Sequence, residues 1–161
     1  MRNQNMYIFA GLLIAAALIA GALVFSAPGP VHVEQKLAGA EVTFYKSPSC
    51  GCCTGHAAAL EAAGATVVIE SVDEVALQSI KDEKGIPLNK QGCHTAVVDG
   101  YVVEGHVPVE ALALLLETKP DTRGITLPGM PIGTPGMPGV QTESFIVETL
   151  EGDIFWQKDP S

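Results

Sequence analysis

Residues 41–53 read EVTFYKSPSCGCC, and they contain three of the four cysteines in the chain. The apolar alternation of residues 41–46 predicts a β-strand. Residues 56–63, HAAALEAA, predict a helix, and Gly64 is suited to end it. The cysteines therefore fall between a strand and the start of a helix, where unpaired backbone N–H groups and the helix dipole favour negative charge. Thiols at such a position ionise readily, and the thiolate is the form that attacks disulfides or binds metal.

The stretch that follows predicts a second strand and a second helix. Residues 66–70, TVVIE, are a β-branched run that predicts a short buried strand. Asp73 can accept a hydrogen bond from the first turn of a helix over residues 74–84. Gly85 is suited to end that helix.

Residues 95–104 predict a β-hairpin, because β-branched runs flank the turn Asp99-Gly100. A last helix is expected over about residues 109–118. The resulting order, βαβαββα, is that of the thioredoxin fold, and the cysteines occupy the place where that fold carries its reactive thiols. We therefore predict an α/β, thioredoxin-like, metal-binding domain over residues 41–119.

Residues 120–161 differ in character and form a C-terminal extension. Within it, residues 124–140 read GITLPGMPIGTPGMPGV, whose prolines and glycines predict neither a regular helix nor a central strand. Met130 and Met137 recur in the same Pro-Gly-Met-Pro frame. This repeat favours a rigid arm that holds two thioethers in place, and the alternative is a disordered tail. Residues 145–158 predict a second small hairpin.

The beginning of the chain predicts export. Residues 7–25, YIFAGLLIAAALIAGALVF, carry no charge, and a helix of that length nearly spans a hydrocarbon core of ~30 Å. The positive-inside rule places the N-terminus, with Arg2, in the cytoplasm and the rest of the chain outside. Residues 1–27 are either an uncleaved transmembrane anchor or a signal peptide, and the length of the apolar run favours the anchor. Residues 28–40 predict a linker.

The charge of the chain limits its partners. Its formal net charge is −9 and its pI about 4.7. Nucleic acid and anionic membrane surfaces repel such a chain, so neither is an expected partner. An N-terminal anchor would be its only contact with a membrane.

Four cysteines in an exported chain ordinarily form two disulfides, but the spacing argues against that here. A bridge between the adjacent Cys52 and Cys53 closes a strained small ring, and one between Cys50 and Cys52 is little better. A single long-range bridge to Cys93 still leaves two thiols clustered. Adjacent side chains diverge by about 100° on a helix, so Cys52 and Cys53 serve two neighbouring ions more easily than one. The spacing fits a small metal cluster at least as well as a single site.

Cys93-His94 stands where thioredoxin-like enzymes usually carry a cis-proline facing the active thiols. The pair therefore predicts two soft ligands opposite the first three cysteines. The alternative is that Cys93 is an ordinary buried cysteine.

Two further histidines and the two methionines of the extension bear on the choice of metal. His106 is either a ligand or a hydrogen-bonded loop residue, whereas His56 is predicted to lie on a helix surface. Thioethers from Met130 and Met137, together with thiolate and imidazole, select Cu(I) over harder ions. Zinc accepts cysteine and histidine but gains nothing from methionine, so it is the less favoured metal.

Four linked motifs resemble one known family, the bacterial CopG-like copper-resistance proteins. They are YKSPSCGCC at residues 45–53, CHTAVV at 93–98, YVVEGHVP at 101–108 and PGMPIGTPGM at 128–137. Together they cover about residues 41–140.

The resemblance implies a periplasmic copper-binding protein with a cysteine-bridged multicopper cluster. It also implies a role in copper tolerance that includes interconversion of Cu(I) and Cu(II), with other periplasmic copper-handling proteins as partners. The chain would then sit on the periplasmic side of the bacterial inner membrane, anchored by residues 7–25, or be soluble in the periplasm if the leader is cleaved. His56 stands where the family commonly has an aromatic residue. The motif positions carried over as metal ligands are Cys50, Cys52, Cys53, Cys93, His94, His106, Met130 and Met137.

Three functions thus compete. The favoured one is an exported copper-binding protein, for which a catalytic role as a copper oxidoreductase stays open. The second is a thiol–disulfide oxidoreductase in which Cys50 attacks and Cys53 resolves, and the extra Cys52 and the missing cis-proline count against it. The third is a disulfide-stapled binding module without metal, which the adjacent cysteines disfavour.

Overall fold

The computed structural model describes residues 35–161. The predicted membrane segment at residues 7–25 lies outside the described part of the chain. None of the helices within residues 35–161 is long and apolar enough to cross a membrane.

The described residues form a mixed α/β fold, and the order βαβαββα predicted for residues 41–119 is present. A short 3₁₀ helix, Leu88–Lys90, precedes the third strand. The other elements are β1 (Glu41–Lys46), α2 (Gly51–Ala62), β2 (Thr66–Ser71), α3 (Glu74–Glu83), β3 (His94–Val98), β4 (Tyr101–Gly105), α4 (Val109–Thr118), β5 (Gly124–Leu127), β6 (Phe145–Thr149) and β7 (Ile154–Lys158).

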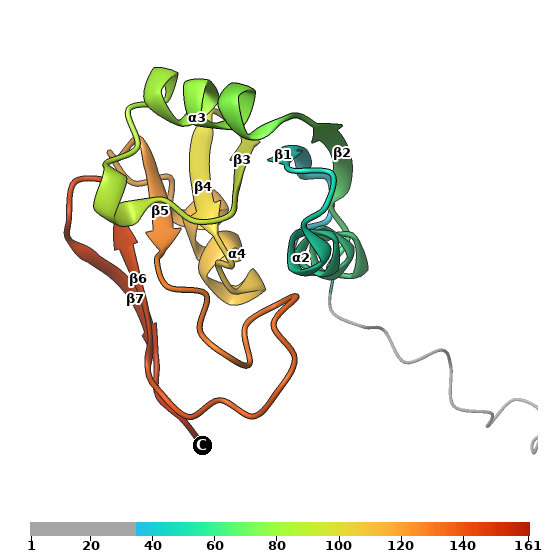
Figure 1. The fold of residues 1–161 in the computed structure, drawn as a ribbon. Coiled ribbons are helices and arrows are strands. Elements are labelled where there is room, and N and C mark those ends of the chain that lie inside the picture. The colour runs from blue at the N-terminus through green and yellow to red at the C-terminus, as the bar shows by residue number, and fades with distance from the viewer. Residues whose placement is uncertain (1–34) are drawn as a thin grey trace, which may run out of the picture. The chain divides into compact units, whose positions relative to one another are not determined.

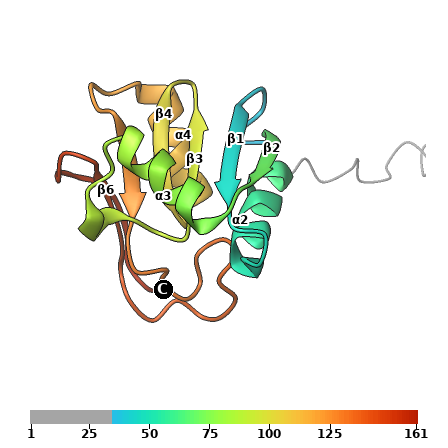
Figure 2. The same ribbon diagram turned by 45° about the horizontal axis from the view of Figure 1, so that its top comes forward.

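All strands join one seven-stranded sheet in the order β2-β1-β3-β4-β5-β6-β7. β1 runs parallel to β2 and antiparallel to β3, and β4 runs parallel to β5. Helix α3 covers one face of the sheet, while α2 and α4 lie on the other (Figures 1 and 2). Between the sheet and the latter two helices lies the main apolar core, which includes Phe44, Leu60, Leu112 and Leu115.

The first strand and helix have clear local causes. Val42 and Phe44 are buried on alternate positions of β1, as the sequence pattern predicted. Helix α2 begins earlier than expected, at Gly51, because Cys50 caps it: the Cys50 sulfur accepts a hydrogen bond from the Cys53 N–H. Cys52 and Cys53 therefore lie in the first helical turn.

The prediction that residues 66–70 form a buried strand was wrong. β2 is an edge strand, and Val68 and Ile69 are 53 % and 44 % exposed. A β-branched run favours any strand, so composition alone does not distinguish a central strand from an edge.

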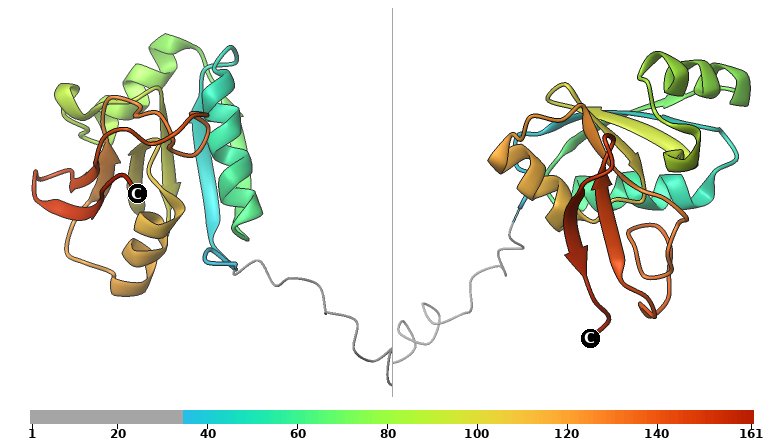
Figure 3. Two further views of the ribbon diagram at one scale, coloured as in Figure 1. Left: turned by 90° about the horizontal axis from the view of Figure 1, so that it is seen from below. Right: turned by 90° about the vertical axis from the view of Figure 1, so that its left-hand side faces the viewer.

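The prediction that residues 124–140 contain no central strand was also wrong, because β5 lies between β4 and β6. The first proline follows only at Pro128, so the four residues of β5 are free to pair on both sides. Gly124 suits this place, since an added Cβ would lie 2.1 Å from the Val102 carbonyl oxygen. The predicted hairpin of β6 and β7 is present, and it extends the main sheet through β5 (Figure 3).

The segment between β5 and β6 runs from the sheet to the start of α2 (Figure 1). Its position is fixed by a close backbone contact with the helix: a Cβ on Gly55 would lie 2.9 Å from the Gly136 Cα. At the other end of the domain, Leu37 is 1 % exposed and its N–H bonds the Ala63 carbonyl. The described end of the predicted linker is thus packed against the domain.

Candidate metal centre

The four cysteines lie together, at the start of α2 and the start of β3. Cys50 and Cys53 form a disulfide with a Cα–Cα distance of 5.4 Å, and Cys52 and Cys93 are free thiols. The bridge joins the two residues that carry the spacing of a redox dithiol. Cys53 is fully buried, while the other three cysteines are partly exposed.

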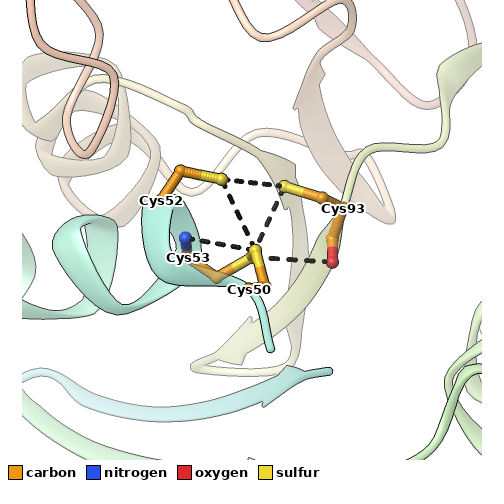
Figure 4. A group of neighbouring side chains, drawn as sticks. All are labelled: Cys50, Cys52, Cys53 and Cys93. Carbon is orange, nitrogen blue, oxygen red and sulfur yellow. Dashed lines mark hydrogen bonds between the residues drawn. A yellow bond between two sulfur atoms is a disulfide. The ribbon is translucent and has the colours of Figure 1, made fainter. Parts of the chain in front are cut away.

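Short sulfur–sulfur distances connect Cys93 to the first turn of α2. The Cys93 sulfur lies 3.5 Å from that of Cys53 and 4.0 Å from that of Cys52. The sulfurs of Cys50 and Cys52 are 3.4 Å apart. The four side chains point toward a common centre, and their sulfurs all lie within 4.8 Å of one another (Figure 4).

Two imidazoles also face Cys93. Its sulfur lies 3.6 Å from Nδ1 of His94 and 3.3 Å from Nε2 of His106. Both histidines are fully buried. Cys93, His94 and His106 thus form a second group whose donor atoms lie within 4.8 Å of one another, and it shares Cys93 with the first.

His56 was predicted on a helix surface, and that prediction was wrong, because its side chain is fully buried. Its Nδ1 lies 2.8 Å from Nε2 of His94, and its Nε2 lies 3.0 Å from the Val107 carbonyl oxygen. Since α2 begins at Gly51, His56 follows Cys53 by three helical positions and shares its buried face. That spacing is the signal in the sequence that could have identified it.

Burial keeps the three imidazoles neutral. Burial and the nearby His106 lower the pKa of His56 from 6.5 to about 3. Burial, together with the neighbouring imidazoles, holds the pKa of His94 well below its ordinary value, and burial lowers the pKa of His106 as well. Neutral imidazole is the form that ligates a metal.

Burial and the adjacent Cys52 raise the pKa of the Cys93 thiol from 9.0 to about 12. In the absence of metal, Cys93 therefore keeps its proton at neutral pH. A metal that binds this sulfur must displace that proton, as is general for thiolate sites.

The His106 ring offers an unprotonated nitrogen to the site. The Pro135 carbonyl can only accept, so Nδ1 of His106, 2.7 Å away, carries the ring proton. A neutral ring then has a bare Nε2, which faces the Cys93 sulfur. Imidazole nitrogen and cysteine sulfur, turned toward one point, form a donor set typical of soft and borderline metals.

The Pro-Gly-Met arm, residues 128–138, reaches this site at Pro135 and Gly136. A Cβ on Gly136 would lie 2.2 Å from the Cys52 carbonyl oxygen, and its φ is +83°. Only glycine fits so close to the helix. Met137 follows and is half-buried, whereas Met130 is 39 % exposed with a φ of 50°.

A buried ionic network lies behind Cys93-His94, and the sequence reasoning missed it. The fully buried Glu104 carboxylate accepts hydrogen bonds from the Lys81 ammonium, from the Gly92 N–H at 2.6 Å and from the Thr95 hydroxyl at 2.7 Å. The network therefore holds the chain on both sides of Cys93-His94. Residues 35–161 contain no cis peptide bond, and the residue before Thr95 is His94.

The cavities of the described residues include two of different size. One, of about 230 Å³, is lined by Cys50 and Cys93, with Ser47 and Lys81. The larger, of about 980 Å³, lies between α4 and residues 36–41 and is lined by none of the cysteines or histidines. Of these two, the smaller belongs to the candidate site.

Comparison with known proteins identifies the family. A family model described as a protein of unknown function, DUF411, matches residues 90–137. No curated protein matches the sequence. Among solved structures, form 1 of copper resistance protein CopG is 32 % identical with a TM-score of 0.65, over 74 % of this chain and 97 % of that one. Form 2 is 33 % identical with a TM-score of 0.65, over 74 % and 98 %. The chain therefore belongs to the CopG-like copper-resistance family.

Proposed function

We propose that this chain is an exported copper-binding protein that holds Cu(I) as a cysteine-bridged multicopper cluster and serves copper tolerance. The observation that carries the proposal is the convergence of four cysteine sulfurs within 4.8 Å of one another. Thiolates are soft ligands that select Cu(I). Copper is the cargo of the protein and not a fixed part of its fold.

A cluster is favoured over a single ion by the position of the cysteines on α2. Cys52 and Cys53 are consecutive helical residues, so their side chains diverge by about 100°. Both are nevertheless within reach of Cys93, at 4.0 and 3.5 Å between sulfurs. Sulfurs placed in this way can each bridge two copper ions.

Histidines and the arm would complete the ligand set. His94 and His106 present ring nitrogens to the same sulfur, and these nitrogens can bind copper when a sulfur ligand is exchanged or oxidised. Met130 and Met137 would add thioethers. A change in ligands between sulfur and nitrogen would suit interconversion of Cu(I) and Cu(II), which have different preferences.

We further propose that β1 to β4, with α2, α3 and α4, form a thioredoxin-like domain that works in the periplasm. The strand order β2-β1-β3-β4 and the thiols between β1 and α2 support the fold assignment. The uncharged residues 7–25 support export, either as an anchor or as a cleaved leader. Other periplasmic copper-handling proteins would then supply or receive the copper.

The test is a titration of the reduced protein with Cu(I) under anaerobic conditions, followed by alkylation of the thiols that remain accessible. Several copper ions per chain, with all four thiols protected, are expected. Failure to bind copper tightly would contradict the proposal.

One observation favours a second function, that of a thiol–disulfide oxidoreductase. Cys50 and Cys53 are bridged, the partly exposed Cys50 lines a cavity, and Cys53 is fully buried. This asymmetry suits an attacking and a resolving thiol. Reduction of insulin disulfides by the copper-free protein would support this function, and the same assay on a Cys52→Ser variant would show whether the third cysteine interferes.

A further inference from the structure

A chain of hydrogen bonds links the Val107 carbonyl to His94 through His56. A carbonyl oxygen only accepts, so Nε2 of His56, 3.0 Å from it, must carry a proton. A neutral imidazole has one ring proton, so Nδ1 of His56 is bare. That nitrogen lies 2.8 Å from Nε2 of His94 and therefore accepts a hydrogen bond from it.

The same logic fixes the proton of His94. With its proton on Nε2, the neutral ring has a bare Nδ1, which lies 3.6 Å from the Cys93 sulfur. The opposite arrangement would put the proton of His56 on Nδ1 and would turn its bare Nε2 toward the Val107 oxygen. Two lone pairs would then face each other in a fully buried place, which is unfavourable.

We propose that His56 is a positioning residue: it holds His94 in the form that carries its proton on Nε2 and presents the bare Nδ1 to copper. This inference rests on the proposed function, because it assigns His94 as a ligand. It goes beyond that function by giving a role to a residue outside the ligand set.

Packing alone does not require a histidine at this position. Phe44 stacks on His94 at 4.4 Å between ring centroids and meets His56 edge-on at 5.8 Å, so flat rings fill the space. A phenyl ring at residue 56 would keep such contacts but would offer no acceptor to His94. The polar atoms of His56 are therefore the part that matters.

The two imidazoles that face Cys93 are held in matching ways. His106 is tied directly to a backbone carbonyl, that of Pro135. His94 is tied to the Val107 carbonyl through His56. Metal-binding histidines generally donate their second ring N–H to such a partner, which fixes both the proton and the ring orientation.

The experiment compares His56→Phe, which removes the acceptor, with His56→Asn, whose side-chain oxygen can take the place of Nδ1. Nitrogen-15 NMR of the imidazoles in the reduced, copper-free full chain reports which ring nitrogen of His94 carries the proton. In the natural protein and in His56→Asn we expect it on Nε2. In His56→Phe we expect this preference to be lost and the Cu(I) affinity to fall about 10–100-fold, with His56→Asn close to the natural value.

Several results would overturn the inference. One is a proton on Nδ1 of His94 in the natural protein, a measurement that needs no variant to fold. A second is an unchanged Cu(I) affinity in His56→Phe. A third is an equal loss of Cu(I) affinity in His56→Asn, because the loss would then result from removal of the imidazole ring and not from removal of the hydrogen-bond acceptor. Absence of copper binding by the natural protein would contradict the proposed function instead, and the NMR result in the copper-free protein would separate the two failures.

Discussion

The Cys53 sulfur lies 3.5 Å from the Cys93 sulfur while it is covalently bonded to Cys50. The bridge takes up two of the four sulfurs of the candidate site, so in the proposed function the bridge and a copper cluster would compete for the sulfurs of Cys50 and Cys53. Closing the bridge oxidises two thiols to a disulfide and transfers two electrons to an oxidant. Opening it requires two electrons and restores these two ligands, so that all four thiols are free.

Copper capacity should therefore depend on the redox state of Cys50 and Cys53. The reduced protein should bind several copper ions per chain, and the bridged protein should bind fewer, because only Cys52 and Cys93 keep free thiols. Metal analysis after gel filtration of the two forms measures this difference. Equal copper content in both forms would show that the bridged cysteines are not ligands.

The methionines of the arm are expected to tighten copper binding. A Met130→Leu/Met137→Leu variant keeps apolar side chains but removes both thioethers, so its Cu(I) affinity should fall while zinc affinity stays unchanged. Competition with a coloured Cu(I) chelator gives the affinity. An unchanged value would remove the arm from the ligand set.

Gly136 should be the point where the arm depends on glycine. In Gly136→Ala the new methyl would collide with the Cys52 carbonyl oxygen, at 2.2 Å, and the arm should lift from α2. The variant should lose stability and should expose the arm to proteolysis. Gly129→Ala is the matched control, because Gly129 has a φ of +86° but nothing within 4 Å of an added Cβ. Gly129→Ala should lose about 1–3 kcal/mol of stability through backbone strain, but its arm should stay bound to α2. Equal proteolysis of the two variants would show that the arm is not released by a collision at Gly136.

Stability of the copper-free protein should fall as the pH drops below about 6.5. The pKa of His56 is lowered from 6.5 to about 3, and those of His94 and His106 are lowered too, so the unfolded chain binds protons that the folded chain does not. The folded chain keeps this part of its free energy of unfolding above the pKa of histidine in the unfolded chain. As the pH falls from that pKa toward the lower pKa of the folded chain, the free energy of unfolding drops by up to about 1.4 kcal/mol per pH unit for each histidine. Urea unfolding between pH 7.5 and 5 measures the slope. His56→Phe should reduce it, and a slope identical to that of the natural protein would refute this account.

Glu104 is expected to be essential only while Lys81 is present. Glu104→Gln leaves a buried ammonium without its counter-charge and should destabilise the fold by about 3–5 kcal/mol. A Lys81→Met/Glu104→Gln variant removes both charges and should recover most of this loss. Chemical denaturation of the three proteins tests the prediction, which fails if the double variant is no more stable than the single one.

Local patterns predicted the elements that depend on neighbouring residues. The turn at Asp99-Gly100 forms the expected hairpin, and Asp73 accepts the expected hydrogen bond from the Ala76 N–H at 2.8 Å. The prediction missed β5 because the pairing of a strand depends on residues far away in the sequence. The prolines and glycines that follow β5 contain no information about those partners.

In the candidate site, too, some features could be predicted from the sequence and others could not. The approach of Cys93 to the first turn of α2 could be predicted from the order of strands and helices. The burial of His56 could not, since it depends on the residue at which α2 begins. Glu104 gave no signal, because helices on both faces of the sheet bury both sides of β4.

The segment between β5 and β6, which contains the arm, is held in the sheet at both ends and contacts α2 at Gly136. A segment fixed at three points cannot swing aside as a free tail would. It therefore stays against the first turns of α2, and we expect any ions bound by the cysteines to enter and leave from another side. In the proposed copper-binding function, the cavity lined by Cys50 and Cys93, on the side of α3, would be the route, so substitution of other lining residues, such as Ser49 and Gln78, should change the rate of copper uptake.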